Sequence, residues 1–133
     1  DIVPLAVATA KENAKSHNVQ THSTQTDWFK GLNDIYDVII SNPPYVASDD
    51  PHLAALSHEP QTALVAGPEG LDDLRHIISQ APNYLSPAGQ LLLEHGHDQG
   101  SAVRRLFAEA GFQNIETHRD LGDNERVTTG YIQ

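Results

Sequence analysis

Apolar residues recur along this chain at spacings that predict both strands and helices. Residues 36–41 hold a valine followed by two isoleucines, and this run predicts a strand buried inside a parallel sheet. Residues 90–94 predict a second buried strand. Between them, residues 71–85 place leucine, isoleucine and alanine on one helical face, which predicts an amphipathic helix. The Pro- and Gly-containing segment 86–89 is expected to end that helix.

The first half of the chain has a weaker pattern. Residues 4–16 predict a helix, because Pro4 suits a first helical turn and apolar residues form one side. Residues 19–25 are rich in threonine and predict a short strand. Residues 42–70 include five prolines. This stretch is too long for an ordinary connection between two elements. We interpret this stretch as a functional loop with short helices.

The second half ends with a helix and a hairpin. Residues 98–110 predict a helix that Gly111 caps. Residues 112–121 and 126–133 then predict two strands joined across a turn at 122–125. The alternation of helices and strands indicates an α/β sheet with an antiparallel strand near one edge.

The strand at 36–41 ends on Asn42-Pro43-Pro44-Tyr45, and ligands of parallel sheets gather where strands end in this direction. The asparagine side chain offers a carbonyl acceptor and an NH2 donor, and the prolines fix the direction of the neighbouring carbonyl groups. The tyrosine ring gives a flat face for stacking. Together these residues predict a clamp for a planar NH2 group. A plain Asn-Pro turn that closes the strand is the simpler alternative.

Composition narrows the classes of partner. Acidic residues outnumber basic ones by 18 to 8, for a formal charge of −10, and Arg104-Arg105 is the only basic pair. Nucleic acid is therefore a poor candidate partner, because its phosphates are normally met by clustered Lys and Arg. The absence of cysteine excludes disulfides and thiolate-bound metals. No apolar stretch reaches membrane-spanning length and no secretory signal is visible, so we expect a cytoplasmic protein.

These motifs resemble the C-terminal catalytic portion of HemK/PrmC-type methyltransferases. Members of that family use S-adenosyl-L-methionine to methylate the side-chain nitrogen (N5) of the glutamine in the Gly-Gly-Gln loop of class 1 peptide-chain release factors. The resemblance runs the whole length of the chain. It is carried by Asp1, Asn13, Asp27-Trp28, 40–45, Glu59-Pro60, Ala63-Leu64, Gly67, Gly70-Leu71, 93–96, Gln99, Gly111-Phe112 and 120–127.

The resemblance implies an α/β fold of the class I SAM-dependent, Rossmann-like methyltransferase type with a C-terminal antiparallel hairpin. Residues 1–133 would form the C-terminal part of the catalytic domain. The N-terminal helical domain, the first strands and the glycine-rich loop that holds the methionine part of the cofactor are not in this chain. We therefore expect a fragment that is inactive alone and binds cofactor poorly. It would self-associate through the exposed edge of strand 36–41.

Cofactor-binding roles come with the same resemblance. Asp1 is similar to the acidic residue that accepts hydrogen bonds from the ribose hydroxyls, although an Asp at a helix start is otherwise a cap or a partner of the helix dipole. Asp27 and Trp28 resemble the pair that borders the adenine, with core packing as the simpler role for the tryptophan. Asn42 is also placed beside the cofactor.

The resemblance assigns the substrate site to the Asn-Pro-Pro-Tyr sequence. Asn42, Pro43 and Tyr45 match the catalytic clamp, and Pro44 belongs to the same substrate-binding turn. Glu59 lies in the family's substrate-side loop, where a surface role is an equal alternative. The arginine that precedes this glutamate in the family is absent, since residues 56–58 read Leu-Ser-His.

Three other interpretations stay open. An adenine-N6 DNA or RNA methyltransferase would use the same clamp on a flipped base. Glu94, His95, His97 and Asp98 could ligate a metal, although this spacing lacks a further committed ligand. The chain could also be a non-catalytic oligomerising unit. Residues preceding Asp1 that form a strand ending in Gly-x-Gly-x-Gly would settle the cofactor class.

Overall fold

The computed structural model describes residues 1–51, 53, 58 and 60–133. The chain divides into two compact units, Asp1–Asn33 and Asp34–Gln133. Glu59 and residues 56 and 57, which figured in the predicted substrate-side loop, lie outside the described residues.

The first unit consists of helix α1 (Pro4–Ser16) and an extended return segment. The helix has the predicted bounds, and Val7 is its buried residue. The predicted strand at 19–25 is wrong, because no strand forms there. The backbone of Asp1 accepts a hydrogen bond from Thr26 N at 2.9 Å, and the amino group of Asp1 donates to Thr24 O at 3.2 Å. Pairing with a single residue does not extend into a ladder, so the segment stays irregular.

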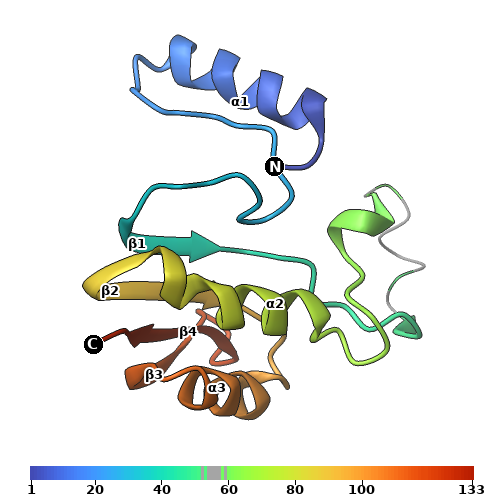
Figure 1. Cartoon of the computed structure of the whole chain (residues 1–133). Helices are drawn as coiled ribbons and strands as arrows, with labels where there is room; N and C mark the ends of the chain where they lie inside the picture. The colour runs from blue at the N-terminus through green and yellow to red at the C-terminus, as the bar shows by residue number, and fades with distance from the viewer. Residues whose placement is uncertain (52, 54–57, 59) are drawn as a thin grey trace. The chain divides into compact units, whose positions relative to one another are not determined.

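The second unit is built on a four-stranded sheet (Figure 1). Its strands are β1 (Tyr36–Ser41), β2 (Leu85–Glu94), β3 (Gln113–Arg119) and β4 (Glu125–Tyr131). Their order is β1-β2-β4-β3, with β1 parallel to β2 and the other pairs antiparallel. This arrangement confirms the predicted α/β sheet and its C-terminal hairpin.

Helices α2 (Asp72–Gln80) and α3 (Gly100–Glu109) lie on one face of this sheet (Figure 1). The core between them and the strands is apolar, as their amphipathic patterns predict. Its most deeply buried apolar side chains are Leu74, Ile77, Ile78, Ala81, Leu91, Leu93, Val103 and Phe107. Glycine is required at Gly130, because a Cβ there would overlap the ring of Phe107.

Two predictions about the central elements are corrected. Strand β1 is not buried: Val38 is 48% and Ile40 is 76% exposed, because β1 is the end strand of the described sheet. The helix predicted over 71–85 ends at Gln80 and continues as the 3-10 helix η3 (Ala81–Tyr84). Pro82 explains the change, since it has no N–H for an α-helical hydrogen bond.

Within the described residues of the long connection after β1 lies a short helix of the predicted kind, the 3-10 helix η2 (Gln61–Ala63). Val46 and Val65 form an isolated parallel bridge, with Val46 N donating to Leu64 O at 2.8 Å and Ala66 N donating to Val46 O at 3.0 Å. The two ends of the connection are therefore tied together just beyond the Asn-Pro-Pro-Tyr sequence. No helix in the described ranges is long and apolar enough to cross a membrane.

Candidate functional site

The site begins where β1 ends. Asn42 is exposed, and among the described residues no hydrogen bond engages its side-chain amide. Pro43, the next residue, is buried, and Pro44 is half-buried. The turn therefore presents an amide side chain to solvent from a backbone that two prolines stiffen. We call residues 42–45 the clamp turn.

Tyr45 closes the clamp turn and is anchored through its backbone carbonyl. Nε2 of Gln99 donates to this carbonyl oxygen at 3.0 Å. Gly70 lies against the same oxygen with φ of +67°, and a Cβ on Gly70 would overlap it. Only glycine combines this positive φ with so close an approach. The carbonyl of Tyr45 is thus enclosed by two segments far away in sequence.

The hydroxyl of Tyr45 is anchored as well. It donates to Oε1 of Glu94, the last residue of β2, at 3.1 Å. Burial raises the pKa of the Tyr45 phenol, and the charge of Glu94 together with this hydrogen bond raises it further. The phenol therefore stays protonated around neutral pH and acts as a fixed donor.

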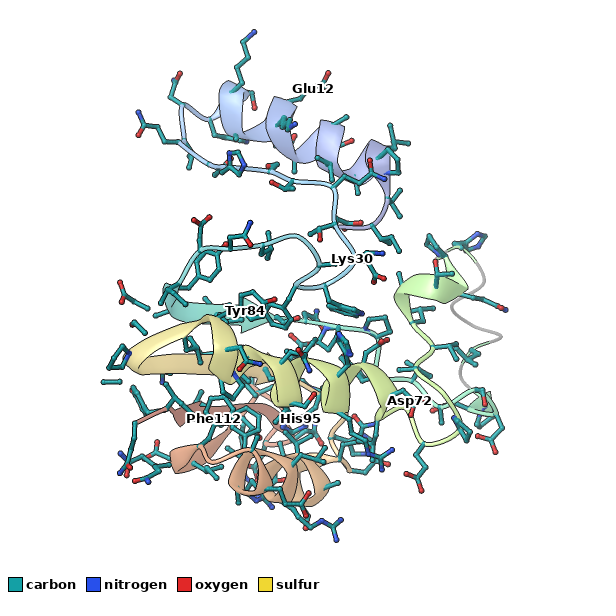
Figure 2. The ribbon with its side chains drawn as sticks, in the orientation of Figure 1. Glu12, Lys30, Asp72, Tyr84, His95 and Phe112 are labelled. Carbon is teal, nitrogen blue, oxygen red and sulfur yellow. The ribbon has the colours of Figure 1, made fainter. Side chains whose placement is uncertain are left out.

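Behind the clamp turn, on the face of the sheet that α3 covers, runs a buried polar chain. His95 is completely buried, with its ring nitrogens 2.8 Å from Gly96 O and 2.9 Å from Thr128 Oγ1. Thr128 Oγ1 lies 2.9 Å from Thr117 Oγ1, which accepts a hydrogen bond from Arg104 at 2.9 Å. Figure 2 shows His95 where the side chains of this unit are crowded. We call these groups the histidine chain.

The hydrogen-bond directions in the histidine chain follow from its ends and from the charge of the ring. Gly96 O only accepts, so Nδ1 of His95 carries a hydrogen. Burial lowers the pKa of His95, which favours the neutral ring, and Nε2 then accepts from Thr128. Because the hydrogen of the Thr128 hydroxyl is used in this way, Thr128 accepts from Thr117, which in turn accepts from Arg104.

Metal binding by this cluster has no support in the geometry. Both ring nitrogens of His95 are already hydrogen-bonded, which leaves none for a ligand bond. Across the residues that the structure describes, no group of three or more His, Cys, Asp and Glu side chains is placed to hold an ion.

The turn between β3 and β4 is tied to the end of β2. Asp120 Oδ1 accepts from Gly122 N at 2.8 Å and from Asn124 N at 3.0 Å, and the Asn124 hydrogen bond is the main reason that the pKa of Asp120 is lowered. Arg126 pairs with Asp120 at 3.4 Å and donates to the carbonyl of His95 at 3.2 Å. This turn therefore supports the strand end that anchors Tyr45.

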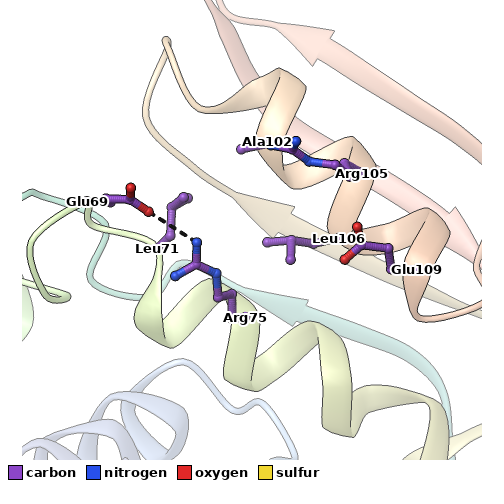
Figure 3. A pocket seen from close by; sticks show the side chains of 7 residues that line it. All are labelled: Glu69, Leu71, Arg75, Ala102, Arg105, Leu106 and Glu109. Carbon is purple, nitrogen blue, oxygen red and sulfur yellow. Dashed lines mark hydrogen bonds and ion pairs between the residues drawn. The ribbon is translucent and has the colours of Figure 1, made fainter.

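A groove of about 570 Å³ lies elsewhere, between α2 and α3 (Figure 3). Leu71 and Leu106 line its floor from the two helices, and Arg75 pairs with Glu69 at 3.1 Å on its rim. None of the residues predicted to bind substrate or cofactor lines this groove. It is a surface feature separate from the clamp turn.

Comparison with known proteins decides the family. Residues 1–120 match the family model described as "Methyltransferase small domain". This chain belongs to the methyltransferase small domain family. Over 98% of its length it is 47% identical to the release factor glutamine methyltransferase of Pasteurella multocida and 48% identical to that of Escherichia coli K12. The resemblance stated from the motifs is therefore confirmed.

The methyltransferase fold is confirmed in three dimensions. A crystal structure of a methyltransferase from Pyrococcus furiosus matches 98% of the chain with a TM-score of 0.73, at 14% identity and over 59% of its own length. The chain spans 45% of the Pasteurella relative and 48% of the Escherichia coli relative. It thus corresponds to about half the length of the curated relatives that it matches.

The residues predicted to bind cofactor are divided between the two units. Asp1, Asp27 and Trp28 lie in the first unit and Asn42 in the second. The carboxylate of Asp1 accepts from Val3 N at 2.8 Å, just before α1. Val3 is the N-cap residue of this helix and no side chain caps it, so Asp1 does not have the capping role named as the alternative. Asp27 is exposed, and the half-buried Trp28 follows it with φ of +49°. A bulky residue in the left-handed region is uncommon and often marks a functional turn.

Sequence reasoning left three residues around the clamp turn without a role there. Gln99, Glu94 and Gly70 surround Tyr45, but none was predicted to act on the clamp turn. The available signal was their presence in the segments that carry the family resemblance. A polar side chain in such a segment with no chemistry of its own is a candidate for holding another residue in place.

Proposed function

We propose that the complete protein, meaning the longest natural polypeptide that contains these 133 residues, methylates peptide-chain release factors. The methyl group passes from S-adenosyl-L-methionine to the side-chain amide nitrogen (N5) of the glutamine in the Gly-Gly-Gln loop. Family membership and the names of the relatives support this proposal. The observation that carries it is the exposed, unengaged amide of Asn42 at the carboxyl end of β1. Because release factors act in translation, the proposal places the protein in the cytoplasm.

The clamp turn has the groups that this reaction requires. An amide nitrogen is a weak nucleophile, because its lone pair is delocalised into the carbonyl. Asn42 Oδ1 and the carbonyl oxygen of Pro43 would accept the two amide hydrogens, and the ring of Tyr45 would support the amide plane. Held in this way, the nitrogen is oriented toward the methyl group and its developing positive charge faces two acceptors. The proton can leave after transfer, so no base with a shifted pKa is needed.

The first unit carries groups that fit the cofactor. A carboxylate such as Asp1 suits ribose hydroxyls, the exposed carboxylate of Asp27 suits the exocyclic amine of adenine, and the indole of Trp28 suits its ring. When bound, S-adenosyl-L-methionine supplies a methyl group that is already activated on a sulfonium sulfur.

The open edge of β1 has a further role in this proposal. Its only strand neighbour in the described sheet is β2, and Val38 and Ile40 are exposed. Exposed apolar edge strands recruit partners. We propose that a preceding strand of the complete protein covers this edge, and that the 133-residue chain alone self-associates through it. Monomeric light scattering of the chain together with micromolar cofactor binding would contradict this.

The experiment that tests the function is a methyl-transfer assay with two substrates. Complete protein and labelled S-adenosyl-L-methionine are incubated with a purified class 1 release factor or with adenine-containing DNA. The proposal predicts label on the Gly-Gly-Gln glutamine, located by mass spectrometry, and none on DNA. Label on adenine N6 instead would establish the alternative in which the clamp turn holds a flipped base. A release factor with Gln changed to Glu in the loop is the matched substrate control.

A further inference from the structure

Gln99 holds three separate segments together around the clamp turn. It lies after β2, as the residue that precedes α3. Its Nε2 is 3.0 Å from Tyr45 O, 3.2 Å from Glu69 O and 3.3 Å from Gly70 O. These carbonyl groups come from residues 54, 30 and 29 positions away in the sequence. A single primary amide therefore crosslinks two loops to the segment that carries it.

The oxygen atom of the Gln99 amide fixes the orientation of the whole amide group. Gln99 Oε1 accepts a hydrogen bond from Gly96 N at 2.8 Å. An amide whose oxygen is held by a backbone N–H must point its NH2 the opposite way, toward the three carbonyl oxygens. Three acceptors surround a group that has two hydrogens, so the donor side is fully used. The flip state of Gln99 is thereby determined by its partners.

Tyr45 is held at two points, by the last residue of β2 and by the residue that precedes α3. Gln99 binds its carbonyl oxygen and Glu94 binds its hydroxyl at 3.1 Å. The Pro43 carbonyl is two residues before Tyr45, across the stiff Pro44. Its direction therefore follows the placement of Tyr45. Asn42, in contrast, has no such restraint in the described structure.

We propose that Gln99 is a positioning residue for methyl transfer, acting through Tyr45 on the clamp turn. This inference rests on the proposed function. Gln99 touches neither substrate nor cofactor; it sets where the carbonyl of Pro43 and the ring of Tyr45 stand relative to the acceptor nitrogen. Displacement by about 1 Å at such a site can cost about 10²-fold in rate, so loss of one crosslink is expected to lower turnover clearly.

The test uses Gln99→Glu in the complete protein. Glutamate keeps an oxygen that can accept from Gly96 N, but it faces the three carbonyl oxygens with an oxygen in place of the NH2 donor. We expect kcat on the release factor to fall at least about tenfold. The KM for S-adenosyl-L-methionine should change less than about twofold, because the first-unit residues are untouched. The matched control is Gln113→Glu, the same charge change at an exposed position of β3.

A second variant guards against a folding defect. Gln99→Met has nearly the same length and removes the donor without placing charge beside the carbonyl groups. It should show the same pattern as Gln99→Glu, with a low kcat and an unchanged KM for the cofactor. Tyr45→Phe removes only the hydrogen bond to Glu94 and should lower kcat less. If Gln99→Glu unfolds, the Met variant decides. A kcat within twofold of wild type in the folded variants would overturn the inference.

Failure of the positioning role for Gln99 can be distinguished from failure of the proposed function. Wild-type protein that leaves the release factor unmethylated refutes the function. Active wild-type protein whose Gln99 variants keep full kcat refutes only the positioning role. A parallel fall of kcat and rise of cofactor KM would indicate general loosening of the fold and would also contradict the proposed role.

Discussion

The polar groups on the two sides of strand β2 differ in whether they are hydrogen-bonded within the protein. Toward β4 and α3, the histidine chain uses every hydrogen-bonding group that it buries, from Arg104 to Gly96. Toward β1, Asn42 and the apolar side chain of Ile40 face solvent. Buried polar groups must be paired, so the first side has no capacity left for a ligand. The side toward β1 keeps an amide, that of Asn42, with which a ligand can form hydrogen bonds.

This difference teaches how to locate the reacting residues. On the paired side, a chemically attractive residue such as His95 is a structural element, because both of its ring nitrogens are engaged. On the open side, a modest residue such as Asn42 is the better candidate, because its amide is available. Glu94 and Gln99 connect the two sides, because each forms a hydrogen bond with Tyr45 and so fixes the clamp turn to the paired side.

The largest effect on stability should separate Leu91 from Ile40. Leu91 is completely buried, so Leu91→Ala in the 133-residue chain should lower the free energy of unfolding by about 2–5 kcal/mol. Ile40 is 76% exposed, and Ile40→Ala should cost less than about 1 kcal/mol. Urea denaturation measures both. In the complete protein the cost at Ile40 should rise if a preceding strand covers β1. Equal losses at the two positions in the 133-residue chain would contradict the openness of β1.

Removing the available amide should affect catalysis and leave stability unchanged. In the complete protein, Asn42→Ala should lower turnover of the release factor by ~10²-fold or more, because a preorganised acceptor of the transition state is lost. Cofactor affinity should stay nearly intact. Asn83→Ala, an exposed asparagine in η3, is the matched control and should have wild-type kinetics. Near-normal turnover of Asn42→Ala would refute its assignment.

A buried hydroxyl on the paired side should show the reverse pattern. Thr128→Val keeps the shape of the side chain but leaves His95 without a donor and Thr117 without an acceptor. An unsatisfied buried group costs about 1–3 kcal/mol, measured as a lower free energy of unfolding of the complete protein. Thr128→Ser keeps the hydroxyl and should lose less than the valine variant. A valine variant as stable as wild type would show that the histidine chain contributes nothing.

The pH dependence of stability should be the smallest of these effects. The folded-state pKa of His95 is lowered from the ordinary value of 6.5. Its contribution is therefore complete above about pH 6.5 and is lost as the pH falls toward the folded pKa, by at most about 1.4 kcal/mol per pH unit. Unfolding at pH 7.5, 6.5 and 5.5 should show a steeper loss for wild type than for His95→Gln. Parallel curves would contradict the neutral, buried ring.

Much of the fold could be predicted because local patterns agree with the packing. The bounds of α1 followed from Pro4 and the apolar side of the helix, and the second half of β2 followed from the run that contains Leu91 and Leu93. The predicted start of β2 was wrong, because the strand begins at Leu85 and includes residues 86–89, which were expected to be only a break after the helix. Two strand predictions failed because the strand pattern in the sequence is not matched by neighbouring strands in the structure. The run in β1 is as apolar as a central strand, but it has one partner in the described sheet and is exposed. Residues 19–25 likewise have the composition of a strand but no ladder.

The candidate site divides in the same way. Asn42, Pro43 and Tyr45 could be named from sequence, since their chemistry is local and the turn follows a predicted strand. Gln99 and Gly70 could not, because their contacts with Tyr45 join residues 54 and 25 positions apart (99 − 45 and 70 − 45) and depend on the closed fold. Whether Glu59 approaches the substrate stays a prediction.

The most direct test is a crystal structure of the complete protein with S-adenosylhomocysteine and a peptide that contains the Gly-Gly-Gln loop. The account predicts that the glutamine amide nitrogen lies about 2.9 Å from both Asn42 Oδ1 and the carbonyl oxygen of Pro43. The ring of Tyr45 should lie against the amide plane. A glutamine bound away from residue 42, with the asparagine side chain still in solvent, would contradict it.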